Sequence, residues 1–174
     1  AVFGRYSTEM VLLAAPVEMD ALVEEIAGDA RVVQLQPGHL ISTDDGVQIE
    51  SVVSKAGSVA ALRIRYGEAS FLLGFELTSH DELGLLSSGW YPRSAVLQVP
   101  GGGSQRANSP TFLMTVQPQV AVMSVAAGNR GGLPHPAVLE WLDQAGQPRV
   151  YHTDRDGKIG VITEGATLEV WTAR

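Results

Sequence analysis

The chain has 174 residues, of which 45% are hydrophobic, and a formal net charge of −7. This length and composition suffice for one domain with an apolar core, and we treat residues 1–174 as a single domain. The absence of cysteine excludes disulfides, zinc–thiolate sites and thiol nucleophiles. The negative charge argues against binding of nucleic acid by general electrostatics. No apolar run approaches the roughly 20 residues that span a bilayer, and nothing at the N-terminus resembles a signal peptide.

The first half of the sequence predicts two strands, a helix and two hairpins. In the second hairpin, Leu62, Ile64 and Tyr66 alternate with Arg63 and Arg65, which predicts one buried face. The expected elements are a buried strand at 9–16, a helix at 20–30 with Asp20 as N-cap, a strand at 31–35, a hairpin at 38–53 with its turn at Asp45-Gly46, and a hairpin at 60–77.

The second half predicts strands that alternate with helices, followed by a run of strands. Ser79 and Glu82 form the capping-box pattern at the first of these helices. The fold class is therefore mixed α and β around a largely buried sheet. The expected elements are a helix at 79–89, a strand at 94–99, a helix at 109–116 opened by Pro110, a strand at 119–126 buried on both faces, a helix at 135–146 and strands over 149–173 with a turn at Asp156-Gly157.

A glycine-rich loop, VPGGGSQRANSP at 99–110, follows one of these strands directly. It lacks the G-x-x-x-x-G-K-[ST] spacing of a Walker loop and the G-x-G-x-x-G spacing of a dinucleotide loop. Ser104 lacks the G-x-S-x-G context of a nucleophilic serine. We therefore expect a tight turn here in preference to a phosphate cradle.

None of the four histidines has the spacing that places two imidazoles on one metal ion. His80, Asp81 and Glu82 are expected to form the solvated first turn of a helix. His135, which precedes a proline at a helix start, is expected to cap the helix or to be exposed. His152 is expected on the surface.

Several motifs, taken in order, resemble the metallo-β-lactamase-like domain of ComEC-type competence proteins, which are membrane channels for DNA uptake. The resemblance lies in GEASFLLGFE, AVLQVPGGGSQRANSP, VAVMSVAAGNRGGLPHP and RVYHTDRDGKIGVIT, and also in GHLISTDDGVQIESV upstream. The family has F-L-L-T-G-D, K-V-P-H-H-G-S, V-A-V-I-S-V-G, N-x-Y-G-H-P and V-Y-R-T-D-R-D-G at these places. The likeness covers most of the chain.

The family's metal ligands are replaced at the aligned positions. Its T-G-D falls on 74–76, so that aspartate becomes Glu76, while H-H falls on Gly101 and Gly102, and the histidine of G-H-P falls on Leu133. Upstream, Ala15, Val17, Met19 and Asp20 stand for His, His, Asp and His. A dinuclear hydrolase needs about six or seven nitrogen and oxygen donors. Only Asp20 and Glu76 remain, so the resemblance implies a vestigial site with no metal, no cofactor and no catalytic residue.

The resemblance also implies a metallo-β-lactamase-like αββα sandwich. Because the family has a further strand layer before the first histidine motif, we expect part of the first N-terminal sheet to be missing or supplied by another chain. An exposed sheet edge would then favour homo-oligomers or pairing with a partner chain.

Three functions compete at this point. The first is a non-catalytic structural or interaction domain, extracytoplasmic and part of a DNA-uptake membrane protein, with DNA or other parts of the channel as partner and no small-molecule substrate. The second is a metal-dependent nuclease or phosphodiesterase, completed by residues outside the chain or by His80, Glu82, His135 and Glu76. The third is a passive DNA-binding domain that uses Arg106, Arg130, Arg149 and Arg155.

Overall fold

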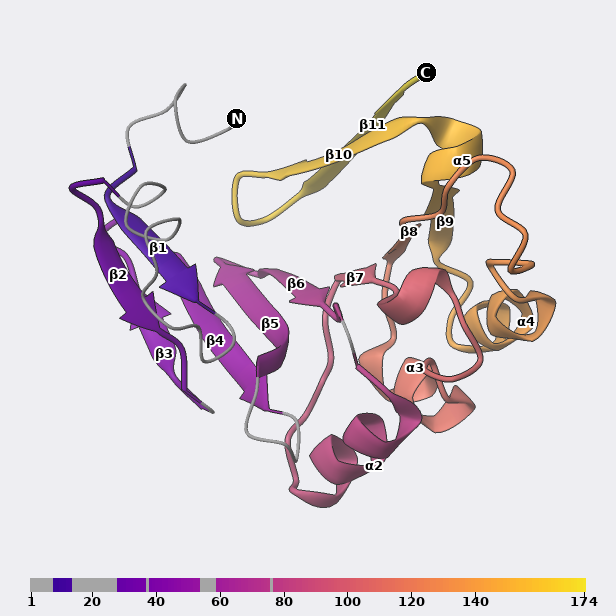
Figure 1. The fold of residues 1–174 in the computed structure, drawn as a ribbon, viewed down its shortest axis with the longest axis horizontal. Coiled ribbons are helices and arrows are strands. Elements are labelled where there is room, and N and C mark those ends of the chain that lie inside the picture. Colours follow the sequence, from indigo (N-terminus) through magenta and orange to yellow (C-terminus); the bar gives the residue numbers. More distant parts are fainter. Residues whose placement is uncertain (1–7, 14–27, 37, 54–58, 76) are drawn as a thin grey trace.

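A computed structural model describes residues 8–13, 28–36, 38–53, 59–75 and 77–174 of the chain. Its largest sheet has seven strands in the order β3-β4-β5-β6-β7-β8-β9 (Figure 1). The strands from β3 to β6 are antiparallel, and those from β6 to β9 are parallel. Their bounds are β3 (Leu40–Ser42), β4 (Gln48–Val53), β5 (Val59–Tyr66), β6 (Ala69–Leu73), β7 (Val96–Gln98), β8 (Val120–Met123) and β9 (Arg149–His152).

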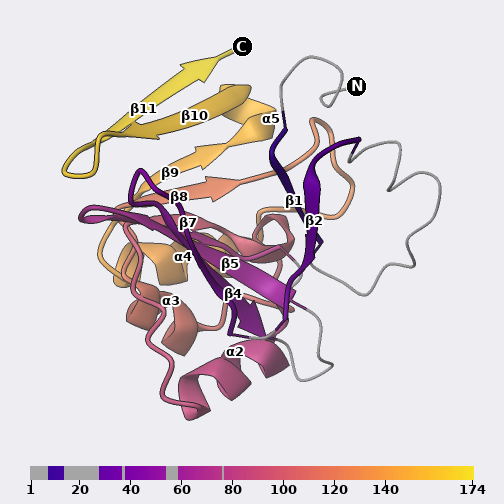
Figure 2. The ribbon, with the colours of Figure 1, turned by 90° about the vertical axis from the view of Figure 1, so that its left-hand side faces the viewer.

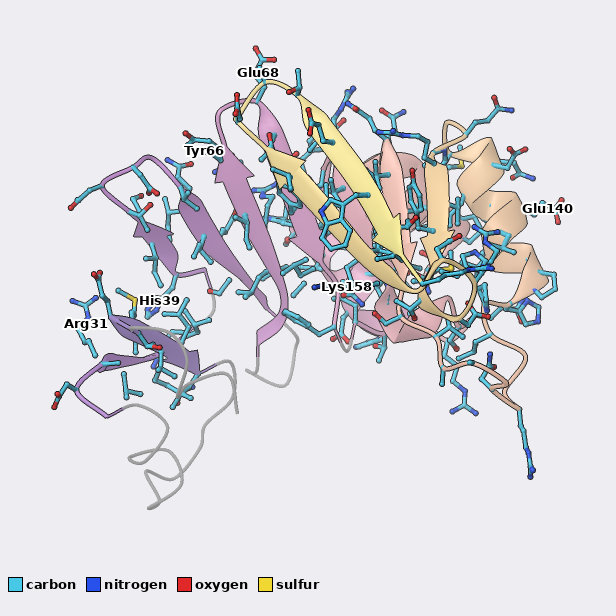
Figure 3. All side chains as sticks on the ribbon, turned by 90° about the horizontal axis from the view of Figure 1, so that it is seen from above. Arg31, His39, Tyr66, Glu68, Glu140 and Lys158 are labelled. Atoms are coloured by element: carbon cyan, nitrogen blue, oxygen red, sulfur yellow. The ribbon has the colours of Figure 1, made fainter. Side chains whose placement is uncertain are left out.

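The two faces of this sheet are covered differently. Helices α2 (Ser79–Ser87), α3 (Pro110–Val116) and α4 (Pro136–Gln144) lie along one face (Figures 1 and 2). The hairpin of β10 (Lys158–Thr163) and β11 (Leu168–Ala173) lies over the other face, as the view from above shows (Figure 3). Two short helical turns, η1 (Pro100–Gly102) and α5 (Thr153–Asp156), follow β7 and β9. The parallel pair β1 (Met10–Leu13) and β2 (Arg31–Gln34) lies beside the β3–β4 end of the sheet.

The main core lies between the sheet and the helices. Phe112, Leu113 and Val116 of α3 and Val138 and Leu142 of α4 are fully buried there. Each such side chain contributes about 1.5–3 kcal/mol when removed from water. The sheet supplies Leu72, Leu97 and Ala121 from three adjacent parallel strands, which explains why these strands are apolar.

The predicted mixed α and β fold class is confirmed, as are both hairpins, the helices that start near Ser79, Ser109 and His135, and the buried strand within 119–126. Most of the predicted helix at 20–30 lies outside the described residues. No helix in the described part of the chain is long and apolar enough to cross a membrane.

Three local predictions were wrong. β1 is half-buried instead of buried, because β2 is its only strand partner among the described residues. The Leu62, Ile64 and Tyr66 face of β5 is only partly buried, since the main core lies on the opposite face, which carries Ala61. The segment after β9 is the short helix α5, which precedes the predicted turn at Gly157.

Candidate functional site

Three loops converge where the parallel strands β6, β7 and β8 end. Because these strands run in register, Leu73 lies opposite Gln98 and Gln98 opposite Val122. The loops that follow therefore meet at one edge of the sheet, where α/β proteins place their ligands. A Cβ atom built on Gly74 would lie 2.6 Å from Cγ of Pro100, which shows how closely the first two loops approach.

The glycine loop has a left-handed backbone. Gly101, Gly102 and Gly103 have φ angles of 55°, 62° and 83°, which side-chain-bearing residues rarely adopt. A Cβ atom on Gly102 would lie 2.9 Å from the backbone oxygen of Ser124 and 3.7 Å from Cδ1 of Leu133. The structure thus brings positions 102 and 133 together, as expected of two aligned ligand positions, but a side chain at residue 102 would require the Ser124 backbone to shift.

The backbone of Leu133 is held by hydrogen bonds to the side chain of Asn129. Its backbone N–H donates to Oδ1 of Asn129 and its backbone oxygen accepts from Nδ2 of the same residue, both at 2.9 Å. The following peptide bond to Pro134 is cis. The Leu133 side chain packs against the main core. It supplies a hydrophobic contact here and no metal donor.

Two buried polar side chains, Glu82 and Asn108, form what we call the loop clamp. Nδ2 of Asn108 donates to the backbone oxygens of Pro100 and Ser104, both at 2.9 Å. The Glu82 carboxylate accepts from the backbone N–H of Asn108 and, at 2.8 Å, from that of Ser109. The clamp ties the glycine loop to α2 and to the start of α3.

The structure corrects the prediction for Glu82. The side chain is 0% exposed and points into the protein instead of standing in a solvated first turn. The capping box is formed one residue earlier, by Thr78 and Asp81. Burial raises the pKa of Glu82, an effect that the hydrogen bonds from Ser109 and Asn108 partly offset. Both carboxylate oxygens thus serve to hold the loop, and Glu82 does not belong to any cluster of potential metal ligands among the described residues.

The histidines have separate roles. His80 is exposed, and His135 caps α4 by accepting the N–H of Ala137 on its Nδ1 at 3.2 Å, which confirms the capping prediction. The surface prediction for His152 was wrong, because it is only 9% exposed. Burial lowers the pKa of His152, and the charge of Arg155 lowers it further. Its ring lies at the end of β9, where Nδ1 is 3.9 Å from a carboxylate oxygen of Asp154.

The four arginines of the DNA-binding hypothesis do not form one surface. Arg106 and Arg130 are exposed in the loops after β7 and β8, whereas Arg149 begins β9 at the opposite edge of the parallel strands. Arg155 is 3.1 Å from the Asp156 carboxylate and donates to the backbone oxygen of Val150. Its charge is therefore partly neutralised.

The described site residues do not fit a dinuclear metal centre. Gly101, Gly102 and Leu133 carry no nitrogen or oxygen in their side chains. Among the described residues, no three histidine, aspartate or glutamate side chains come together in a way that could hold a metal ion. The other aligned positions, Ala15, Val17, Met19, Asp20 and Glu76, lie outside the described residues.

Sequence reasoning missed the loop clamp. The only local signal is Asn108 directly before the Ser-Pro helix start, because asparagine tolerates the left-handed backbone found there at φ 66°. No spacing rule links Glu82 to a residue 26 positions further on.

A search of known proteins supports the resemblance. ComE operon protein 3 of Bacillus subtilis (strain 168) is 30% identical to the chain over 151 residues, which is 87% of this chain and 19% of that protein. The chain therefore spans only about a fifth of its relative's length. A proposed Zn-dependent hydrolase of the metallo-β-lactamase superfamily from Thermotoga maritima has a TM-score of 0.47 and 15% identity, over 83% of this chain and 80% of its own. No family model matches.

Over 87% of its residues the chain is thus similar in sequence to about a fifth of ComE operon protein 3.

Proposed function

We propose that this chain is a non-catalytic structural or interaction domain, derived from a metallo-β-lactamase-like hydrolase and working within a DNA-uptake membrane protein. The single observation that carries the proposal is the proximity of positions 102 and 133, since a Cβ atom built on Gly102 would lie 3.7 Å from Cδ1 of Leu133. Two positions where the family has histidines lie close together but hold a glycine and a leucine, and a side chain at residue 102 would begin only 2.9 Å from the backbone oxygen of Ser124.

The surrounding packing supports this proposal. A histidine cluster without its metal would leave polar groups poorly satisfied in a partly buried pocket. Glycine and leucine at these positions remove the free-energy cost of burying unsatisfied polar groups. The Leu133 side chain packs on the core, and the clamp of Glu82 and Asn108 holds the loop by hydrogen bonds that need no metal. The loop is therefore stabilised by contacts within the protein.

Metal analysis tests the proposal. We expect purified protein to contain far less than one equivalent of zinc or manganese by plasma mass spectrometry, and added Zn²⁺ or Mn²⁺ to leave its melting temperature unchanged. Stoichiometric metal would overturn the proposal.

A nuclease assay with Mn²⁺ or Zn²⁺ on the chain and on its full-length parent gives a second measurement. Asp20→Asn with Glu76→Gln is the matched variant, because these residues carry the two carboxylates left at the aligned positions. We expect no metal-dependent cleavage by either protein. Cleavage that this double variant abolishes would establish a hydrolase.

A further inference from the structure

A groove of about 440 Å³ lies at the edge of the sheet opposite the glycine loop. It is formed where β6, β7 and β8 begin, together with the end of β5 and the loop that leads into β7. Its lining includes Arg63, Arg65 and Arg93, with Tyr91, Gln117 and Gln119 around them. This volume falls within the range of small-molecule sites.

Arg63 is fixed in place at one side of this arginine groove. Its Nε donates to Oε2 of Glu50 at 2.9 Å, and a terminal nitrogen donates to the backbone oxygen of Tyr91 at 2.6 Å. Its guanidinium lies 4.6 Å from the ring centroid of Trp90, whose Nε1 in turn donates to Glu50. The carboxylate of Glu50 neutralises the charge of Arg63, and the contacts together hold its side chain in one position at the side of the groove.

Arg65 and Arg93 are not neutralised in this way. Arg65 lies two residues from Arg63 on the same face of β5, opposite Ser70 on β6. Both side chains are exposed, and neither has an ion-pair or hydrogen-bond partner within the described part of the chain. The one carboxylate that lines the groove, that of Glu68, lies at the tip of the β5–β6 hairpin and points outward (Figure 3).

The groove thus holds two unpaired guanidinium groups, although the net charge of the chain is −7. Guanidinium forks match the geometry of phosphate oxygens, and the amides of Gln117 and Gln119 can donate further hydrogen bonds. We propose that the groove binds a phosphate group, borne either by a small molecule or by a nucleic-acid strand, through Arg65 and Arg93. This site is independent of the glycine loop and of whether the domain binds metal.

The test is a titration at low ionic strength with pyrophosphate, followed by amide chemical shifts. We expect shifts at Gln117, Gln119 and Ala95, which lie in the groove, and loss of at least about tenfold in affinity for Arg65→Gln with Arg93→Gln. Because both arginines are exposed and unpaired, this variant should keep its melting temperature.

The matched control is Arg106→Gln with Arg130→Gln, which removes the same charge at the opposite edge. We expect it to bind pyrophosphate like the unmodified protein. Equal losses in both double variants, or no shifts in the groove, would overturn the proposal.

A second arm uses a 12-nucleotide single strand as the probe, to identify the source of the phosphate. Tighter binding of the strand than of pyrophosphate, lost in the groove variant, assigns the site to nucleic acid. Binding of pyrophosphate alone assigns it to a small molecule. Strand binding lost only in the control variant would place the phosphate site at the other edge and contradict the proposal.

Discussion

At the scale of single residues, the buried carboxylate of Glu82 has the largest structural effect that sequence reasoning did not foresee. It is fully buried and accepts two backbone N–H groups that come from the segment between the glycine loop and α3. An unsatisfied buried N–H costs free energy comparable to a lost hydrogen bond. Glu82 therefore stabilises the loop by satisfying two donors that would otherwise be buried without partners.

Replacing Glu82 by glutamine tests this role. The carboxamide keeps only one acceptor oxygen, so one of the two N–H groups loses its partner, and we expect a loss of about 1–3 kcal/mol in the free energy of unfolding. Amide hydrogen exchange at Asn108 and Ser109 should accelerate. The control is Glu140→Gln, on the exposed face of α4 (Figure 3), which should change neither quantity.

The cost of Glu82→Gln should also depend on pH. Because burial raises the pKa of Glu82 in the folded protein, the folded state holds this proton more tightly than the unfolded state does. The stabilisation linked to that proton is complete below the ordinary pKa of 4.5 and is lost as the pH rises through the folded pKa. Urea unfolding over a pH series should show the difference between unmodified protein and variant shrinking with rising pH. A difference independent of pH would contradict this expectation.

At the scale of elements, the glycine loop after β7 has a defined left-handed backbone that is packed closely against its neighbours. Its three consecutive left-handed residues favour glycine, and a Cβ atom on Gly102 would lie only 2.9 Å from the backbone oxygen of Ser124. The resemblance implies a histidine loop in which glycines replace the two imidazole-bearing residues. The backbone now excludes their return at Gly102 without a shift of the neighbouring strand end.

A series of glycine-to-histidine substitutions separates these effects. Gly131→His meets neither a left-handed backbone nor a close contact, Gly128→His meets only the left-handed backbone, and Gly102→His meets both. We expect losses near zero, about 1–2 kcal/mol, and more than about 2 kcal/mol, respectively, in the free energy of unfolding. Chemical denaturation measures all three. Equal losses for Gly102→His and Gly128→His would show that the Ser124 contact is unimportant.

At the scale of the whole molecule, the seven-stranded sheet ends at β3 on one side. Leu40 on that edge strand is 56% exposed, although the strand has only three residues. Exposed edges pair with other strands, and short edges limit that pairing. The expected homo-oligomer through a sheet edge therefore stays a prediction, and β3 is one edge of the described sheet at which it can be tested.

Leu40→Lys tests this edge. A charge there should lower self-association in sedimentation experiments by several-fold without loss of stability, because the side chain is exposed. Leu83→Lys is the matched control, since Leu83 is 59% exposed on α2, away from that edge. A chain that is monomeric at all concentrations, or that responds equally to both substitutions, would count against an interface at β3.

The sequence by itself determined the fold class, both hairpins, the approximate start of each long helix in the described part of the chain and the similarity to ComE operon protein 3. These depend on local features: apolar periodicity, turn residues, caps and ordered motifs that survive alignment. The sequence also identified Gly102 and Leu133 as aligned positions, although their proximity depends on the parallel register of β7 and β8.

Only the tertiary structure decided which polar residues are buried and which cations are free. Glu82 and His152 look like surface residues in sequence, yet both are buried, because packing against distant segments sets exposure. Arg63 and Arg65 look equivalent along one strand. Arg63 is paired with Glu50 on the neighbouring strand, while Arg65 has no ion-pair partner among the described residues. Such long-range pairings leave no periodic signal, since they are fixed by strand register and loop paths instead of by local spacing.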